Sequence, residues 1–220
     1  MRRSSRFRGP AGVRLCGPVQ LCRRREFQAR MSIESVFAEN RNVMHAAAML
    51  SPLLQDVTAV LQECLVSKNK ILVCGNGGSA ATAQHFVAEL VCRFRDDRPA
   101  LAAIALTADS MTLTAVGNDY GYEQIFARQV EALGAPGDVL VALSTSGQSP
   151  NVIEAARVAR SKQCKVVAFT GMDGGALAPL ADVAVRAPSQ VVARIQEVHD
   201  VCIHAIAEAL EQNACGAGRG

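Results

Sequence analysis

Short apolar, β-branched runs alternate with helix-like stretches through the last two thirds of the chain, and this alternation restricts the fold more than any other feature. Strands are predicted over residues 70–74, 101–106, 138–143, 165–170 and 182–186. Helices are expected between and after them, over about 79–94, 123–133, 150–162 and 190–212. Because such alternation builds right-handed βαβ units, the sequence predicts an α/β fold: a three-layer sandwich in which helices flank both faces of a five-stranded parallel sheet.

Apolar residues upstream of the first strand recur at spacings of three or four, from Val43 to Leu65. This pattern predicts N-terminal helices over residues 32–67, interrupted near Pro52. The apolar stripe needs a partner, which the sheet of the same chain or a neighbouring subunit would supply equally well. We therefore divide the chain into a leader (1–30), an N-terminal helical segment (31–66) and a main domain (67–220).

Arginine is concentrated in the leader. Residues 1–30 hold nine arginines and one acidic residue, Glu26, so subtracting their charge of +8 from the net +3 leaves the rest of the chain at −5. The leader lacks the continuous apolar segment of a secretory signal. We expect it to be disordered or translated upstream sequence, with Met31 the natural start, ahead of a transit peptide or a basic nucleic-acid-binding arm.

Composition excludes several classes of protein. No uninterrupted apolar run reaches the roughly 18–20 residues of a membrane-spanning helix, so no membrane partner is expected. Aromatic residues make up only 4% of the chain, too few for a base-stacking surface, so no nucleic acid is expected either. The eight cysteines form no Cys-x-x-Cys pair, and Cys74, Cys164 and Cys202 lie in apolar runs. A reduced, cytoplasmic protein with buried thiols is expected.

The segment "CGNGGSAATAQHF" follows the first predicted strand and holds three glycines. They allow a tight turn into a helix that starts near Ser79, and the free amides at such a helix start favour an anion. The spacing is neither G-x-G-x-x-G nor that of a P-loop, so dinucleotide binding is weakly supported. On this loop alone, a phosphate site and an ordinary strand-to-helix turn are equally supported.

A second loop, "STSGQSPN", follows the third predicted strand and brings four hydroxyls between Ser144 and Ser149. Hydroxyls and helix-terminal amides can surround a phosphate without a lysine, although serine and threonine also cap helices. Ligands of parallel sheets bind at the carboxyl ends of the strands. Two hydroxyl-rich loops at this edge favour a sugar-phosphate site.

Two predicted helices carry side chains suited to a metal or to proton transfer. His85 and Glu89 lie four residues apart and share one helix face, although such a pair is more often a surface hydrogen bond. The last predicted helix carries further polar residues in an apolar setting: Gln196, Glu197, His199 and His204. Helical geometry alone does not choose among these four.

Several motifs in fixed order carry a resemblance to a known family. They are "CGNGGSAATAQHFVAEL", "AVGNDYGYEQIF", "GDVLVALSTSGQSPNVI", "TGMDGG" and "ARIQEVHDVCIHAI". Over about residues 32–212 the chain resembles the SIS-domain (sugar isomerase) family and, within it, the phosphoheptose isomerases. The resemblance implies a flavodoxin-like SIS fold with N-terminal helices. It also implies an aldose–ketose isomerase that converts D-sedoheptulose 7-phosphate to D-glycero-D-manno-heptose 7-phosphate through an enediolate, the first step of ADP/GDP-heptose biosynthesis.

The same resemblance implies roles for individual residues. Glu89 matches the catalytic base and His204 its partner acid/base. One Zn²⁺ per subunit is implied, with the ligands His85, Glu89, Gln196 and His204. The implied substrate contacts are Asn76, Gly77, Gly78, Ser79, Glu89, Asn118, Asp119, Ser144, Thr145, Ser146, Ser149 and Gln196. Ala193 departs from the members that carry an acidic residue there, which puts one substrate contact in doubt but not the activity.

The resemblance further implies a homotetramer with active sites at subunit interfaces. The main competing hypothesis is a non-catalytic SIS adaptor that binds the bacterial replication initiator DnaA. That relative lacks the acidic residue at the position of Glu89 and the histidine at that of His204, whereas this chain keeps both. A sugar-phosphate-sensing regulator would come with a DNA-binding module, for which residues 1–30 are too short.

Overall fold

The structure is a computed structural model that describes residues 32–217, with side chains up to residue 214. The expectations for the leader therefore lie outside the described residues. The described residues from Ala38 onward form one compact unit. The division at residues 66 and 67 stays a prediction.

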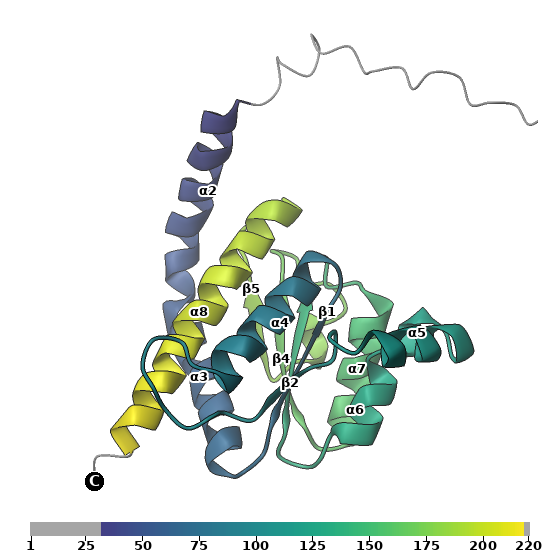
Figure 1. Cartoon of the computed structure of the whole chain (residues 1–220). Helices are drawn as coiled ribbons and strands as arrows, with labels where there is room; N and C mark the ends of the chain where they lie inside the picture. The colour runs from purple at the N-terminus through teal and green to yellow at the C-terminus, as the bar shows by residue number, and fades with distance from the viewer. Residues whose placement is uncertain (1–31, 218–220) are drawn as a thin grey trace, which may run out of the picture. The chain divides into compact units, whose positions relative to one another are not determined.

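Helices and strands alternate along this unit, as the sequence predicts (Figure 1). The strands are β1 (Ile71–Gly75), β2 (Ala103–Ala105), β3 (Val139–Ser144), β4 (Lys165–Thr170) and β5 (Val183–Arg186). The helices are α2 (Ile33–Ala47), α3 (Ser51–Val66), α4 (Gly78–Val91), α5 (Ser110–Asp119), α6 (Ala127–Leu133), α7 (Pro150–Ser161) and α8 (Val192–Ala217). Short 3₁₀ turns are η1 (Ala48–Leu50), η2 (Tyr122–Gln124) and η3 (Ala178–Leu180).

The five strands form one sheet in the order β2-β1-β3-β4-β5, and every neighbouring pair is parallel. The prediction of a five-stranded parallel sheet is therefore confirmed. β1 and β3 are neighbours although β2 lies between them in sequence. Their carboxyl ends, and the loops that follow them, consequently meet at one edge.

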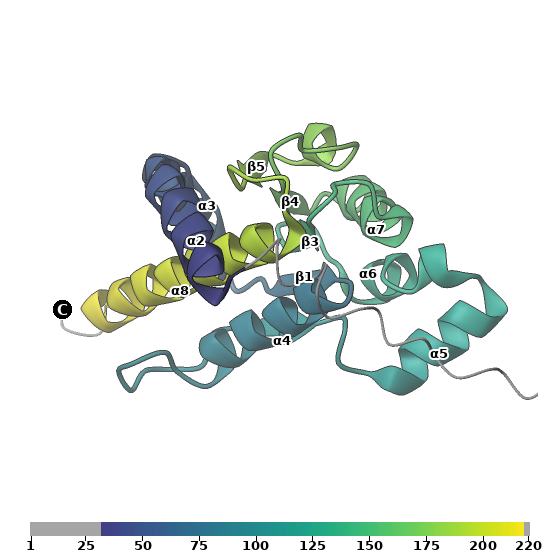
Figure 2. The ribbon, with the colours of Figure 1, turned by 90° about the horizontal axis from the view of Figure 1, so that it is seen from above.

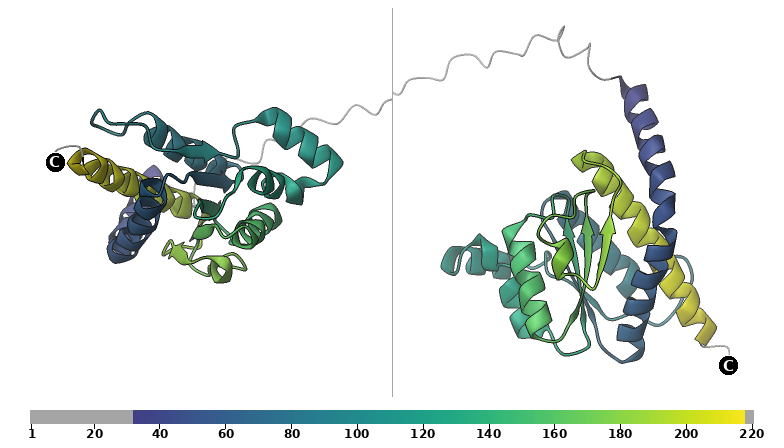
Figure 3. Two further views of the ribbon diagram at one scale, coloured as in Figure 1. Left: turned by 90° about the horizontal axis from the view of Figure 1, so that it is seen from below. Right: turned by 180° about the vertical axis from the view of Figure 1, so that it is seen from behind.

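Alternate residues of β1, β3, β4 and β5 enter two separate cores. Ile71 and Val73 of β1 pack with α3, α4 and α8, whereas Leu72 and Cys74 pack with α6 and α7. Figure 2 shows α4 and α8 together on one side of the sheet and α6 and α7 on the other, and Figure 3 shows the same layers from below and behind. A sheet buried on both faces explains why β1 and β3 are uniformly apolar.

The stretch Ile33–Val66 is long and apolar enough, by length and composition, to cross a membrane. Buried core helices pass the same test. Within this stretch, Val57, Leu61 and Cys64 of α3 lie in the core with β1 and β3. The interruption predicted near Pro52 is the 3₁₀ turn η1, after which Pro52 occupies the first turn of α3. There its missing N–H costs no helical hydrogen bond.

The sequence analysis missed α5. Its ten residues include two threonines, a glycine, an asparagine and an aspartate, which give little helical signal. Asp109 caps the helix by accepting hydrogen bonds from the amides of Met111 (3.0 Å) and Thr112 (3.3 Å). Leu113 and Val116 pack against the second core. The helix expected over 123–133 is also shorter, since η2 takes its first residues.

The described cysteines with placed side chains are all free. Cys74, Cys164 and Cys202 are buried, as expected from their apolar surroundings, and Cys92 is exposed. Burial raises the pKa of the Cys74 thiol to about 12. A thiol of that kind stays protonated and behaves as a small apolar side chain.

His199 is a core residue that holds α8 on the sheet. Only 1% of it is exposed, and its Nε2–H donates a hydrogen bond to the carbonyl oxygen of Thr170 at 3.1 Å. Its ring meets the ring of Phe169 edge-on, at 5.6 Å between centroids. Burial lowers the pKa of His199 to about 4, although the Thr170 carbonyl and Asp200 oppose the shift. The imidazole is therefore neutral in the folded protein at pH 7.

This neutral histidine predicts a loss of stability in mild acid. Between pH 6.5 and 4 the unfolded chain protonates His199 and the folded chain does not, so the free energy of unfolding falls as the pH falls. From pH 7.5 to pH 5 this one group should remove about 2 kcal/mol. His199→Gln should lose that part of the pH dependence in urea denaturation. His45→Gln, at an exposed histidine, is the control, and an unchanged pH dependence in His199→Gln would contradict the prediction.

Candidate active site

The loop after β1 turns directly into α4. Gly77 has a φ of 55°, a conformation that favours glycine, and a Cβ at this position would meet no atom within 4 Å. Gly78 is different, because a Cβ there would lie 2.4 Å from Nε2 of Gln196. The two glycines thus serve separate needs. Gly77 leaves open space in front of the helix start, and Gly78 admits the side chain of Gln196.

The loops after β1 and β3 are tied together by a pair of amides. Asn76 donates from Nδ2 to Oδ1 of Asn151 at 2.8 Å, and Asn151 donates from Nδ2 to Oδ1 of Asn76, also at 2.8 Å. Tyr122 donates its hydroxyl to Oδ1 of Asn76 at 3.1 Å. Asn76, predicted as a substrate contact, therefore also positions the two loops. Asn151 was not predicted as a site residue. Its place directly after Pro150, at the start of α7, was the available signal.

The hydroxyl-rich loop after β3 is arranged around a pair of serines. Ser144 and Ser149 lie with their Oγ atoms 2.9 Å apart, and Ser144 is buried. Ser149 occupies the N-cap position of α7 but its side chain makes no capping hydrogen bond. Helix capping therefore does not account for Ser149. Ser146 accepts a hydrogen bond from the amide of Gln148 at 3.1 Å.

Space for a ligand lies beside this loop. A pocket of about 340 Å³ is lined by Thr145 and Ser146 on one side and by the start of α8 on the other. The loop that follows β4, with Gly171 and Asp173, supplies another wall. A volume of this order is typical of small-molecule sites.

Three of the predicted residues meet between α4 and α8. Nε2 of His85 lies 3.1 Å from Oε1 of Glu89 and 3.4 Å from Nε2 of His204. The candidate ligand atoms of all three residues lie within 4.8 Å of one another. His85 is exposed, while Glu89 and His204 are half-buried. The pair on α4 is thus joined by a histidine 119 residues later in the sequence.

The four polar residues of α8 are separated by the structure. His204 faces His85, and Gln196 packs on Gly78 at the start of α4. Glu197 instead accepts hydrogen bonds from Arg194 and from Asn40 (2.6 Å). His199 faces the sheet, as described above. Of these four residues, only His204 reaches the cluster with His85.

Residues further along α4 contact residues further along α8. Gly78 meets Gln196, Thr82 donates a hydrogen bond to Asp200 at 2.7 Å, and His85 meets His204. The partners rise together in number, so the two helices run in the same direction. This register decides which side chains of α8 face His85 and Glu89.

Asn118 and Asp119 lie outside this cluster. Both are exposed at the end of α5, and Asn118 donates a hydrogen bond to Asp119 at 2.7 Å. Ala193 is exposed at the start of α8. Their predicted roles toward a sugar remain predictions.

The cluster of His85, Glu89 and His204 has the composition of a metal site. Two imidazole nitrogens and a carboxylate oxygen are the donors that zinc prefers, and three protein ligands are typical of catalytic zinc sites. In a tetrahedral site with bonds near 2.1 Å, neighbouring donors are about 3.4 Å apart. The separations of His85 from Glu89 (3.1 Å) and from His204 (3.4 Å) are close to that spacing, and the three donor atoms together span up to 4.8 Å.

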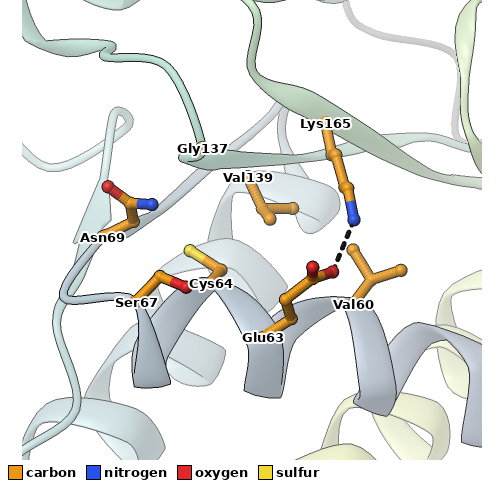
Figure 4. Close-up of a pocket in the computed structure, with 8 residues that line it drawn as sticks. All are labelled: Val60, Glu63, Cys64, Ser67, Asn69, Gly137, Val139 and Lys165. Atoms are coloured by element: carbon orange, nitrogen blue, oxygen red, sulfur yellow. Dashed lines mark hydrogen bonds and ion pairs between the residues drawn. The ribbon is translucent and has the colours of Figure 1, made fainter.

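A smaller pocket of about 90 Å³ lies at the opposite edge of the sheet (Figure 4). Asn69, Gly137 and Lys165 line it where β1, β3 and β4 begin, and Lys165 forms an ion pair with Glu63 at 2.6 Å. None of the predicted site residues lines this pocket. It plays no part in the candidate active site.

Comparison with known proteins identifies the family. The sequence model of the SIS domain matches residues 34–171. A phosphoheptose isomerase from Shewanella loihica is 52% identical over 170 residues, which are 76% of this chain and 86% of that protein. A phosphoheptose isomerase from Chromohalobacter salexigens is 47% identical over 175 residues, covering 78% and 89% of the two chains.

Solved structures agree with the sequence matches. The phosphoheptose isomerase of Neisseria gonorrhoeae superposes with a TM-score of 0.78 at 44% identity, over 84% of this chain and 99% of that one. That of Francisella tularensis gives a TM-score of 0.80 at 42% identity, over 82% and 96%. The chain therefore belongs to the SIS-domain family and, within it, to the phosphoheptose isomerases.

Proposed function

We propose that the protein interconverts D-sedoheptulose 7-phosphate and D-glycero-D-manno-heptose 7-phosphate, the isomerisation that begins ADP/GDP-heptose biosynthesis. The observation that carries the proposal is the meeting of His85, Glu89 and His204 within 4.8 Å. These residues come from separate helices and lie at the positions where the family resemblance puts catalytic and metal-binding groups. The names of the relatives support the same reaction.

The phosphate of the substrate would bind between the two loops at the carboxyl ends of β1 and β3. Ser79 is buried in the first turn of α4, and Ser144 and Ser149 present a pair of hydroxyls. Hydroxyl and amide donors can hold a dianion without a lysine. Binding the phosphate at a fixed point sets which sugar carbons reach the cluster between α4 and α8.

The reaction moves one proton between two carbon atoms. In the direction from ketose to aldose, the Glu89 carboxylate removes a proton from C1, and the C–H electrons form the C1–C2 enediolate. His204 supplies a proton to C2 from the other helix, while the hydroxyl proton of O1 is lost and O2 gains one. No oxidant is needed, since C1 is oxidised as C2 is reduced. General acid–base groups of this kind contribute about 100- to 10,000-fold each.

We further propose that His85, Glu89, Gln196 and His204 hold one zinc ion. When bound, zinc polarises the sugar oxygens as a Lewis acid and stabilises the negative charge that develops on them. Gln196 lies against Gly78, at the end of α4 nearest the phosphate loops. Its amide would also orient the sugar hydroxyls.

The protein is proposed to act as a homotetramer in the cytoplasm, with active sites at subunit interfaces. The side chain of His85 is 46% exposed in the single chain, whereas proton return to the sugar requires a site with little water. Exposed apolar side chains, among them Met49 and Val66, offer surface for neighbouring subunits. A solution mass of four chains would support this part of the proposal.

The alternative of a non-catalytic adaptor for the replication initiator DnaA is not favoured. The relatives reported above are named as isomerases. The chain also keeps both Glu89 and His204, which the adaptor lacks, and its STSG motif stays intact around Ser144. An adaptor would have no use for a proton-transfer pair.

A direct assay tests the proposed function. Protein stripped of metal with a chelator and supplied with sedoheptulose 7-phosphate should form aldoheptose 7-phosphate slowly, as followed by NMR. Added zinc should accelerate the conversion at least about tenfold. An equal rate with and without zinc would argue against the metal. If folded protein gave no product in either condition, the adaptor hypothesis would take its place.

Glu89→Gln tests the base. The substitution keeps the size and polarity of the side chain but removes its basicity, so turnover should fall by about 100- to 10,000-fold with the fold unchanged. Circular dichroism and zinc titration of the same sample separate a lost base from a lost metal. Glu131→Gln, which removes an exposed carboxylate on α6, should keep normal turnover. A near-normal rate in Glu89→Gln would refute its role as the base.

Ser144→Ala and Ser149→Ala test the phosphate site. A hydrogen bond to a charged group contributes about 1.5–3 kcal/mol, so each change should raise KM about tenfold or more. Inorganic phosphate should inhibit both variants less than the parent protein. Ser161→Ala, at the exposed end of α7, is the matched control. An unchanged KM and unchanged inhibition by phosphate would show that Ser144 and Ser149 do not bind the phosphate.

A further inference from the structure

A buried carboxylate on α8 organises the loop that follows α4. Glu211, which is 3% exposed, accepts three backbone hydrogen bonds from that loop. Their donors are the amides of Phe94 (2.8 Å), Arg95 (2.7 Å) and Asp96 (2.9 Å). Burial raises the pKa of Glu211, but these amides and Arg98 outweigh it and the net shift is downward. The carboxylate is therefore charged when it binds the loop.

Arg98 connects Glu211 to the end of α4. Its side chain is fully buried, and its Nε lies 3.4 Å from the Glu211 carboxylate. Nη2 donates to the carbonyl oxygen of Glu89 at 2.7 Å, and Nη1 donates to that of Leu90 at 2.8 Å. These carbonyls belong to the last turn of α4, where a helix lacks internal donors and its dipole favours a cation. Arg98 thus caps α4 at the residue proposed as the base.

Glu211 lies on the same face of α8 as His204. Seven residues separate them, which is close to two helical turns. Phe94, whose amide Glu211 holds, places its ring 5.7 Å from the ring of His204. In the view of Figure 1 the loop after α4 crosses α8, to which its amides are hydrogen-bonded. One end of the ion pair therefore fixes the backbone of Glu89, and the other fixes the helix and the aromatic neighbour of His204.

We propose that Arg98 and Glu211 are positioning residues of the isomerase site, which set the separation of α4 and α8 and thereby hold Glu89 and His85 within reach of His204. The pair touches neither substrate nor metal and acts only through the groups it holds. The inference rests on the proposed function, which assigns His85, Glu89 and His204 their roles in metal binding and proton transfer. If the pair only stabilised the fold, its substitution would lower the free energy of unfolding measured in urea but leave the site of the folded protein unchanged.

Arg98→Lys and Glu211→Gln test the pair. Lysine keeps the positive charge but lacks the planar guanidinium with which Arg98 contacts two carbonyls and a carboxylate. Glutamine has one acceptor oxygen where the Glu211 carboxylate has two. Both variants should raise the Kd for zinc of the metal-free protein at least tenfold in calorimetry. They should also alter the visible absorption bands of bound Co²⁺. Their kcat should fall at least tenfold while KM stays within about twofold, because the phosphate loops lie at the other end of α4.

The chain offers a matched control. Arg95 and Glu208 join the same loop to the same helix by an ion pair of 2.7 Å, but their side chains are 68% and 37% exposed. Glu208→Gln, which removes this ion pair and leaves the Arg95 side chain in place, should therefore match the parent in zinc affinity, Co²⁺ spectrum and kcat. All measurements are made where urea denaturation shows the variants to be folded.

Each outcome decides the matter. Parental zinc Kd, Co²⁺ spectrum and kcat in folded Arg98→Lys and Glu211→Gln would overturn the inference and leave the proposed function intact. If both variants fail to fold, Phe94→Leu, which removes the ring beside His204 without a buried charge, should weaken zinc binding and lower kcat, and parental values would overturn the inference. A parent protein that neither binds zinc nor isomerises would overturn the proposed function itself, and the inference with it.

Discussion

The parallel packing of α4 against α8 is the constraint on which the candidate site depends. Neither helix carries a complete site, because His85 and Glu89 come from one and His204 from the other. The contact of Gly78 with Gln196 at one end and the Arg98–Glu211 pair at the other fix both ends of this packing. A small change of helix spacing would separate donor atoms that now lie 3.1 and 3.4 Å apart.

The sheet supplies the second constraint. Because β1 and β3 are hydrogen-bonded neighbours, the loops that follow them must adjoin. The mutual amide bonds of Asn76 and Asn151 then fix one loop against the other. The dianion site proposed here is thus built from hydroxyls and amides in a mildly acidic body. Neutral donors select a ligand by where they are placed and not by net charge. Such a site is suited to distinguish sugar phosphates that carry the same charge but differ in shape.

The strands were predictable as short apolar, β-branched runs, and most helices by their hydrophobic period. Helix α5 was not, since its signal is an Asp109 cap and not a stripe. Spacing along α8 could pair His85 with several residues, and only the rotation of α8 about its axis, set by core packing such as that of His199, selects His204. Glu211 was out of reach of any sequence pattern, because its partners are backbone amides brought to it by a loop.

The long sequence separations within the site have a consequence for how the protein is made. The contact of His85 with His204 spans 119 residues, and that of Glu211 with the loop after α4 spans up to 117. Chains emerge from the ribosome amino end first, and non-local contacts form only after their loops close. A nascent chain that still lacks α8 also lacks a large part of the core on one face of the sheet, to which Ile203, Ile206 and Leu210 belong. The last helix to be made therefore completes both the cluster of His85, Glu89 and His204 and the core on its face of the sheet.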